Sequence, residues 1–170
     1  MAEFDVNHEI EVLEKSLERH LSWIRQSDTK SQMLIAINLV LVSAVLSETP
    51  KADAFTWRTA AIIFLGNIVP CWNLFKCFAT ITPHVKALNN SLVFFGTINK
   101  MTIDEYKNAV KSRTQEDYLD DLIIQTYTNA KIADIKYRRI KHAADLTFLS
   151  LPVTLFAVAL LFFQVVSRLR

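Results

Sequence analysis

Three long stretches of the chain carry no charged residue and are dominated by apolar side chains. They cover residues 31–47, 59–75 and 146–167. A helix over the third stretch rises about 33 Å at 1.5 Å per residue, which exceeds the roughly 30 Å of a bilayer's hydrocarbon core. The first two stretches are at the short end of the spanning range, and the second can continue to about residue 80. The pattern predicts an all-helical membrane protein with three transmembrane helices, over about residues 31–47, 59–80 and 146–167.

The segment before the first apolar stretch predicts an amphipathic helix that continues into it. Apolar residues recur at steps of three and four between residues 6 and 24, which is the spacing of one helix face. The same steps then reach Asp28 and Asn38. No glycine or proline interrupts residues 6–47, so we expect one helix of about 40 residues. We expect Asn38, inside the span, to hydrogen-bond between helices and to fix assembly.

The connection between the second and third spans contains two predicted helix starts. Thr102 precedes Glu105 by three residues, and Thr114 precedes Asp117 by the same interval, as in helix capping boxes. The second start opens a helix that meets no breaker before Pro152 and therefore runs into the third span. Its expected apolar face is Leu119, Leu122, Ile123, Tyr127, Ala130, Tyr137 and Ile140.

Two other stretches of the chain are expected to depart from regular helix. Pro70 lies inside the second span and should kink it, and Pro83 should end that helix. Residues 88–101 contain aromatic residues and Gly96 but no helical period, so we expect an irregular segment there. The implied architecture is one membrane-anchored helical domain, residues 1–170, with two of its helices extended into a cytosolic bundle.

Composition argues against several classes of function. A net charge of +2 is too small to favour nucleic acid as a partner, and two glycines in the chain leave no Gly-rich phosphate loop. Cys71 and Cys77, six residues apart, predict neither a disulfide nor a metal pair. His142 and Asp145 are one helical turn apart, but without a second histidine at helical spacing this is weak evidence for metal or base chemistry. We predict no catalytic residue and no metal site.

The charges beside the spans predict the orientation in the membrane. Four positive residues flank one side of the three spans and ten flank the other, and positive residues favour the cytoplasm. The N-terminus and residues 81–145 are therefore expected in the cytoplasm. The smaller set is Lys51, Arg58, Arg168 and Arg170. The larger set is Arg19, Arg25, Lys30, Lys76, Lys86, Lys131, Lys136, Arg138, Arg139 and Lys141.

The strongest candidate site is the basic segment that precedes the third span. It contains Lys136, Arg138 and Arg139 beside Tyr137. One interpretation is that these residues set topology and contact anionic headgroups. The other is a phosphate site, because arginine binds phosphate in bidentate geometry and aromatic faces stack on bases.

Two further segments favour a ligand site at the same membrane surface. Arg25, Asp28 and Lys30 cluster where the first span begins, and an acid on an apolar stripe needs a partner. The aromatic pair before Gly96 lies in the middle connection. An ion pair from Asp28 to the basic segment would explain part of this arrangement without a ligand.

Three short motifs stand in a recognisable order: SDTKSQMLIAIN at residues 27–38, VFFGTI at residues 93–98, and DLI at residues 121–123 followed by KYRR at residues 136–139. In these motifs the chain resembles the Pycsar transmembrane effector family. The similarity extends over roughly residues 15 to 166. The resemblance implies a bacterial inner-membrane effector of antiphage defence that answers to cyclic UMP or cyclic CMP made by a partner cyclase, and that impairs the membrane.

The resemblance also implies where the signal is sensed. The candidate ligand-binding residues are Lys30, Phe95, Gly96, Lys136, Tyr137, Arg138 and Arg139, with Arg25 and Asp28 as a structural or sensing pair. The expected partners are the lipid bilayer, further copies of the chain and the cyclase. Two alternatives remain open, a passive scaffold whose cytosolic helices dock a partner protein and a small membrane enzyme. The nucleotide, the number of subunits and the choice between a pore and lipid disorder are also open.

Overall fold

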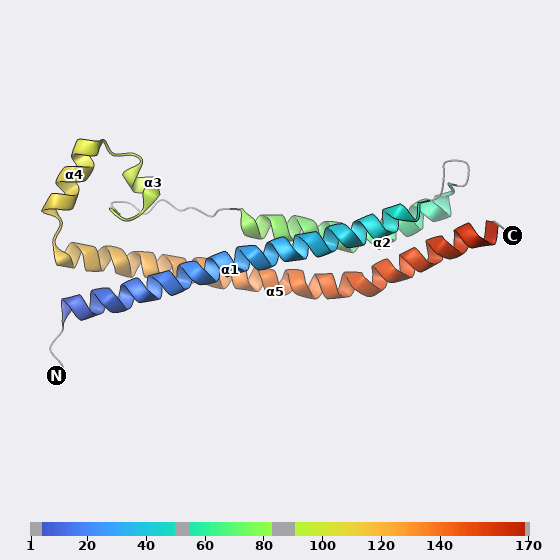
Figure 1. Cartoon of the computed structure of the whole chain (residues 1–170), viewed down its shortest axis with the longest axis horizontal. Coiled ribbons are helices and arrows are strands. Elements are labelled where there is room, and N and C mark those ends of the chain that lie inside the picture. Colours follow the sequence, from blue (N-terminus) through green and yellow to red (C-terminus); the bar gives the residue numbers. More distant parts are fainter. Residues whose placement is uncertain (1–4, 50–54, 83–90, 169–170) are drawn as a thin grey trace. The chain divides into compact units, whose positions relative to one another are not determined.

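The computed structural model describes residues 5–49, 55–82 and 91–168. Within these residues the chain forms five helices and no strand, in the order shown in Figure 1. The helices are α1 (Val6–Ser47), α2 (Trp57–Ile81), α3 (Phe95–Ile98), α4 (Ile103–Ser112) and α5 (Gln115–Arg168). Residues 88–90 of the segment expected to be irregular, and Lys51, Lys86 and Arg170 of the charge comparison, lie outside the described residues.

Three of these helices are long and apolar enough to cross a membrane: α1, α2 and α5. The predicted all-helical fold with three spanning helices is confirmed. As expected, α1 and α5 also continue well beyond their apolar stretches, to 42 and 54 residues respectively. The predicted helix starts are present too, because Thr102 and Glu105 form a capping box at α4 and α5 begins directly after Thr114.

The expectation of an irregular segment around Gly96 is wrong for residues 95–98, which form the single helical turn α3. The Ser91 hydroxyl accepts hydrogen bonds from the Val93 and Phe94 amides at 3.2 and 3.0 Å, which turns the chain just before the helix. The short turn escapes a periodicity argument because four residues cannot display a period of 3.6.

The chain divides into two compact units. One comprises residues 1–25 and 83–135, and the other comprises residues 26–82 and 136–170. We call them the polar unit and the spanning unit. Both α1 and α5 contribute residues to each unit.

In the polar unit, the first turns of α5 lie against the first turns of α1. The Tyr118 hydroxyl donates to the Glu14 carboxylate at 2.6 Å, and the Gln115 amide donates to Asn7 at 3.2 Å. Leu119 and Leu122 are buried here, as expected for the apolar face of α5. Tyr127 of the same expected face is 61% exposed and Ile123 is also exposed, so the prediction of that face is wrong at these two positions.

In the spanning unit, the three helices bury faces made mainly of small and polar residues. The buried positions recur at alternating steps of about three and four residues, the 3.5-residue spacing of coiled-coil packing. On α1 they are Ser27, Ser31, Asn38, Leu41 and Val45. On α2 they are Thr59, Gly66, Pro70, Asn73, Cys77 and Thr80. On α5 they are Lys136, Ile140, Ala143, Thr147, Ser150, Thr154, Ala157 and Leu161.

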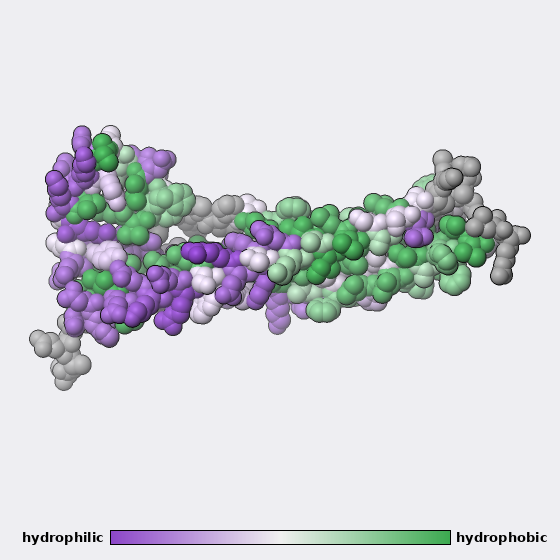
Figure 2. Space-filling model, viewed as in Figure 1, coloured by the Kyte–Doolittle hydropathy of each residue, from purple (hydrophilic) through white to green (hydrophobic). Residues whose placement is uncertain are grey.

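Most large apolar side chains of the spanning unit face outward, although Leu41, Ile140 and Leu161 are buried. Phe64, Phe75, Phe156 and Phe163 are all exposed, and Figure 2 shows a mostly apolar surface over the spanning parts of these helices. This is the reverse of a soluble bundle. It fits helices in lipid, where close approach of small residues and hydrogen bonds drive association because lipid is as apolar as leucine.

Pro70 explains one contact between α2 and α5. A proline inside a helix has no N–H, so it cannot bond the carbonyl four residues earlier, which here belongs to Gly66. The Thr154 hydroxyl of α5 donates to that carbonyl at 3.4 Å. A helix in hydrocarbon tolerates proline when a neighbour satisfies the freed group in this way.

Candidate functional site

Asp28 of α1 and Lys136 of α5, both predicted site residues, form an ion pair in the spanning unit. Lys136 donates to the Asp28 carboxylate, and Lys136 is only 7% exposed. The apolar stripe of α1 brings Asp28 to the α5 interface, and a buried charge there requires an opposite charge. An ion pair from Asp28 to the basic segment, one of the interpretations of the sequence, is therefore present, with Lys136 as its partner.

Lys30, two residues after Asp28, and Tyr137, next to Lys136, also meet. The Lys30 ammonium lies 5.3 Å from the centre of the Tyr137 ring, within the range of a cation–π contact. Lys30 and Tyr137, both predicted as ligand-binding residues, are thus in contact.

Arg139 contacts the end of α2. Its guanidinium donates to the Ala79 carbonyl at 3.1 Å, one of the last-turn carbonyls that have no partner within the helix. A cation at a helix C-terminus is also favoured by the helix dipole. Arg138, the next predicted residue, is exposed on α5.

Phe95, Gly96 and Arg25 of the predicted set belong to the polar unit, whereas its other members belong to the spanning unit. Phe95 is 67% exposed, with its ring 4.8 Å from that of Phe94. A Cβ at residue 96 would lie 2.5 Å from the Phe94 ring, so glycine lets this ring cover the backbone. Gly96 therefore has a packing role within α3, and the exposed Phe95 ring can stack on a planar ligand.

A cavity of about 430 Å³ in the polar unit, between α4 and α5, is lined partly by charged side chains. Its walls include Arg113 and three carboxylates, those of Asp117, Asp120 and Asp121. Arg113 donates to Asp121 at 2.8 Å and covers the Tyr118 ring at 4.5 Å. Because negative charges outnumber the guanidinium, this cavity is a poor site for an anion.

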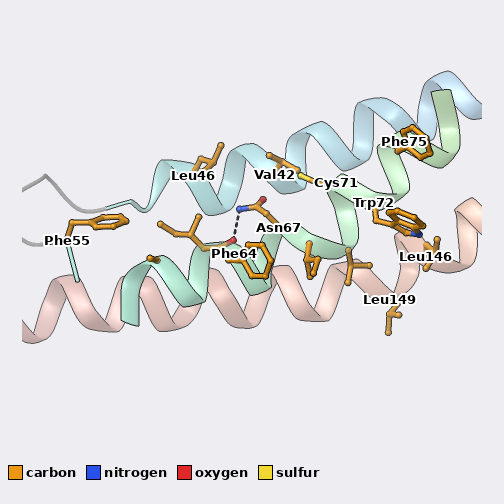
Figure 3. A pocket seen from close by; sticks show the side chains of 14 residues that line it. Val42, Leu46, Phe55, Phe64, Asn67, Cys71, Trp72, Phe75, Leu146 and Leu149 are labelled. Atoms are coloured by element: carbon orange, nitrogen blue, oxygen red, sulfur yellow. Dashed lines mark hydrogen bonds between the residues drawn. The ribbon is translucent and has the colours of Figure 1, made fainter. Parts of the chain in front are cut away.

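A second cavity, in the spanning unit, has apolar walls. It has a volume of about 1190 Å³ and lies between the helices of that unit, with Phe64, Trp72 and Leu149 among its walls (Figure 3). Asn67 also lines it, and the Asn67 amide donates to the Ile63 carbonyl at 2.9 Å. Such walls suit lipid chains and offer no group for a phosphate.

A hydrogen-bonded layer inside the spanning unit was not predicted from the sequence. Asn73 of α2 donates to Thr147 of α5 at 2.8 Å and to the Ala143 carbonyl at 2.9 Å. Asn38 of α1 donates to Thr147 at 3.0 Å. The expectation that Asn38 hydrogen-bonds between helices is confirmed, and its partners are in the same chain. One feature of the sequence could have indicated this layer: small or polar residues recur every seven positions along α2, at Thr59, Gly66, Asn73 and Thr80.

Four groups of the polar unit have shifted pKa values. The hydrogen bond from Lys15 and its charge lower the pKa of the Glu11 carboxyl. Hydrogen bonds from Thr102 lower the pKa of the Glu105 carboxyl. Hydrogen bonds from Thr114 lower the pKa of the Asp117 carboxyl in the same way. The hydrogen bond to the Glu14 carboxylate raises the pKa of Tyr118. Within the described residues no group of three or more potential ligands could hold a metal ion.

These features define a multi-pass helical membrane protein with polar helix interfaces and a charged set at one end of its spanning unit. A family model described as the Pycsar effector protein domain, PycTM, matches residues 12–163. The chain belongs to this family, as the resemblance of its motifs indicated, and is a cyclic-nucleotide-activated antiphage membrane effector. No curated protein and no solved structure matches it.

Proposed function

We propose that this effector is its own sensor for a cyclic pyrimidine nucleotide, cyclic UMP or cyclic CMP, and that the bound nucleotide makes it impair the bacterial inner membrane. The observation that carries the proposal is the ion pair between Asp28 and Lys136, beside Lys30 and Tyr137, in a chain of this family. The proposed ligand residues are Lys30, Phe95, Gly96, Lys136, Tyr137, Arg138 and Arg139, with Arg25 and Asp28 as the sensing pair.

The physical basis is competition between two anions for one ammonium. The cyclic phosphodiester carries one negative charge, and the Asp28 carboxylate already occupies Lys136. A phosphate that approaches Lys136 competes with Asp28, while the pyrimidine packs on the aromatic ring of Tyr137. Asp28 links this event to α1, because loss of its partner destabilises the packing of α1 on α5. A ligand drives such a switch only by binding the active state more tightly.

The first test is thermal unfolding of the detergent-purified protein with cyclic UMP, cyclic CMP, cyclic AMP and cyclic GMP at matched concentrations. A ligand present at 100 times its Kd stabilises the folded state by about 2.7 kcal/mol. We expect a shift with one pyrimidine nucleotide. No shift with any of the four would contradict self-sensing.

A second test uses charge reversals in cells that carry the partner cyclase. Lys136→Glu and Arg139→Glu should abolish nucleotide-triggered growth arrest while the protein still inserts in the membrane. Lys141→Glu is the matched control, because Lys141 is exposed on the same helix and changes the local charge equally. Arrest that persists in the first two variants would refute the proposed ligand set.

The proposed orientation places the N-terminus and the polar unit in the cytoplasm, where the cyclase product is available. The ten-to-four excess of positive residues supports it. We also propose that the whole chain acts as one membrane-anchored domain without catalytic activity, and that it assembles with further copies of itself. Reporter fusions after residue 5 and within residues 50–54 would test the orientation, with cytoplasmic activity expected only for the first.

A scaffold that docks a partner protein is the second candidate function. It is favoured by exposed apolar residues in the polar unit, among them Ile103, Val110, Ile124 and Tyr127. A purified chain that binds no nucleotide but retains a defined protein partner through these residues would favour the scaffold.

A further inference from the structure

Hydrogen-bonded polar layers run along the inside of the spanning unit. The central layer joins all three helices through Asn38, Asn73 and Thr147, and all three residues are buried. Asn73 also contacts Asn38 directly, at 3.4 Å. This layer lies within the apolar stretches of all three helices: Asn38 is well inside the first, whereas Asn73 and Thr147 lie near one end of the second and third.

The polar layers continue on both sides of the central one. In one direction along α5 lies the ion pair of Lys136 and Asp28. In the other direction, Thr154 bonds the Gly66 carbonyl, and beyond it Thr59 donates to Gln164 at 3.2 Å. We call the buried polar residues of these three helices within the spanning unit the polar seam. Its members are Ser27, Ser31, Asn38, Thr59, Asn73, Thr80, Lys136, Thr147, Ser150 and Thr154, with Asp28 and Gln164 as their partners.

One cluster interrupts these layers. Val45, Ala157 and Leu161 are buried together, and the partly buried Ile62, Ile63 and Val158 pack against them. Along α5 this cluster lies between Thr154 and Gln164, so polar contacts precede and follow it. We call it the apolar plug. A hydrophobic constriction of this kind excludes water from a path until the path widens.

The outer faces of the same helices carry large apolar side chains. Hydroxyl and amide groups of the polar seam can exchange their mutual hydrogen bonds for bonds to water when the helices move apart. The outward phenylalanines meanwhile stay in lipid. A bundle packed through leucine would instead expose apolar surface on opening. The spanning unit therefore has the composition of helices that can line water on one face and lipid on the other.

We propose that the polar seam is the latent wall of a water-filled path for small ions, and that the apolar plug is its gate. The inference rests on the proposed function, and it specifies membrane impairment as ion leakage through protein. The groups between the plug and the Asp28–Lys136 pair are uncharged, so the path passes small ions of either sign with weak selectivity. Its opening requires the three helices to separate, alone or within an assembly of chains.

The test uses the full-length chain in liposomes, with ion flux and release of an entrapped carboxyfluorescein dye as separate readouts. Leu161→Ser, in the plug, should raise ion flux several-fold without any nucleotide. Val45→Thr has nearly the same shape and serves as a second plug variant that retains the fold. Leu155→Ser is the matched control, because Leu155 is on the same helix but is 64% exposed, whereas Leu161 is 1% exposed.

Several outcomes decide between this path and lipid disorder. Ion flux that rises in both plug variants and not in Leu155→Ser, with the dye retained, supports the gate. Equal flux in plug and control variants overturns it. Dye release by nucleotide-treated wild type that is unchanged in Asn73→Leu also overturns it. If the plug variants leak ions while no nucleotide triggers flux in wild type, the path stands and the proposed sensing fails.

Discussion

Gly66 of α2 lies directly against Ala157 of α5. A Cβ at residue 66 would stand 2.6 Å from the Ala157 Cβ and 3.3 Å from a Val45 methyl. Neither neighbour is the end of a flexible side chain, so one of the helices would have to shift. Glycine thus sets how closely α2 approaches α5 at the level of the apolar plug.

Gly66→Ala is expected to destabilise the spanning unit by about 1–3 kcal/mol, the usual range for an overpacked interface. Thermal unfolding in detergent measures this loss. Leu65→Ala is the control, since Leu65 is exposed and should change stability by less than about 0.5 kcal/mol. Equal stability of wild type and Gly66→Ala would show that the two helices are not in contact.

Thr154→Val should leave the Gly66 carbonyl without a donor in hydrocarbon, because Pro70 supplies none. We expect a loss of about 1–3 kcal/mol, the cost of an unsatisfied buried acceptor. Pro70→Ala restores an N–H that can bond this carbonyl.

The same pair of substitutions forms a double-mutant cycle. Thr154→Val should cost less in the Pro70→Ala background than in wild type, as judged by unfolding of all four proteins. Additive costs would show that the threonine does not replace the bond lost to proline.

Asp28→Asn removes the charge that holds Lys136 in the spanning unit. Since Lys136 is nearly buried and Asp28 is partly exposed, the loss should fall at or below the 3–5 kcal/mol of a broken buried pair. If Lys136 also binds the phosphate, Asp28→Asn should bind cyclic nucleotide more tightly. Asp28→Asn combined with Lys136→Met should recover stability and lose binding, as measured by calorimetry. Unchanged affinity in the single variant would exclude competition between Asp28 and the ligand.

The start of α4 should respond to acid. Hydrogen bonds from Thr102 lower the pKa of Glu105 in the folded chain. The stabilisation from this capping interaction is therefore fully present above pH 4.5, the ordinary pKa of the group. It is lost as the pH falls through the lowered pKa. Amide chemical shifts at Thr102, followed by NMR, should therefore titrate below pH 4.5. Thr102→Ala removes the hydroxyl but keeps the backbone N–H, which lowers the pKa most, so the midpoint should move only part of the way toward 4.5. An unmoved midpoint would show that the hydroxyl does not contribute to the lowered pKa.

Much of the helical architecture follows from local sequence. Uncharged runs long enough for a bilayer predict the spans, and the absence of glycine and proline predicts the length of α1. Thr102 with Glu105 marks the start of α4 because a capping box is a local interaction. Periodicity correctly indicated that Asp28 and Asn38 face a partner. The resemblance of short motifs in the same order indicated the family.

Other features depend on which helices pack together. The apolar face expected for α5 includes Tyr127 and Ile123, which are exposed, because apolarity alone cannot distinguish a core position from a surface position. Inside the membrane this ambiguity is complete, since large apolar residues face lipid and small polar ones face protein. Within the spans, apolarity therefore does not identify the interface, and the polar residues that interrupt the apolar pattern, such as Asn38, do.

The sequence by itself determined three spans, two extended helices, the family and the need of Asp28 for a partner. These properties depend on length, charge and spacing within single segments. Only the tertiary structure selected Lys136 as that partner, joined Asn38 to Asn73 and Thr147, and set Thr154 against the carbonyl that Pro70 leaves free. Each of these contacts joins residues from different helices, and it forms because hydrocarbon offers no water to satisfy the same groups.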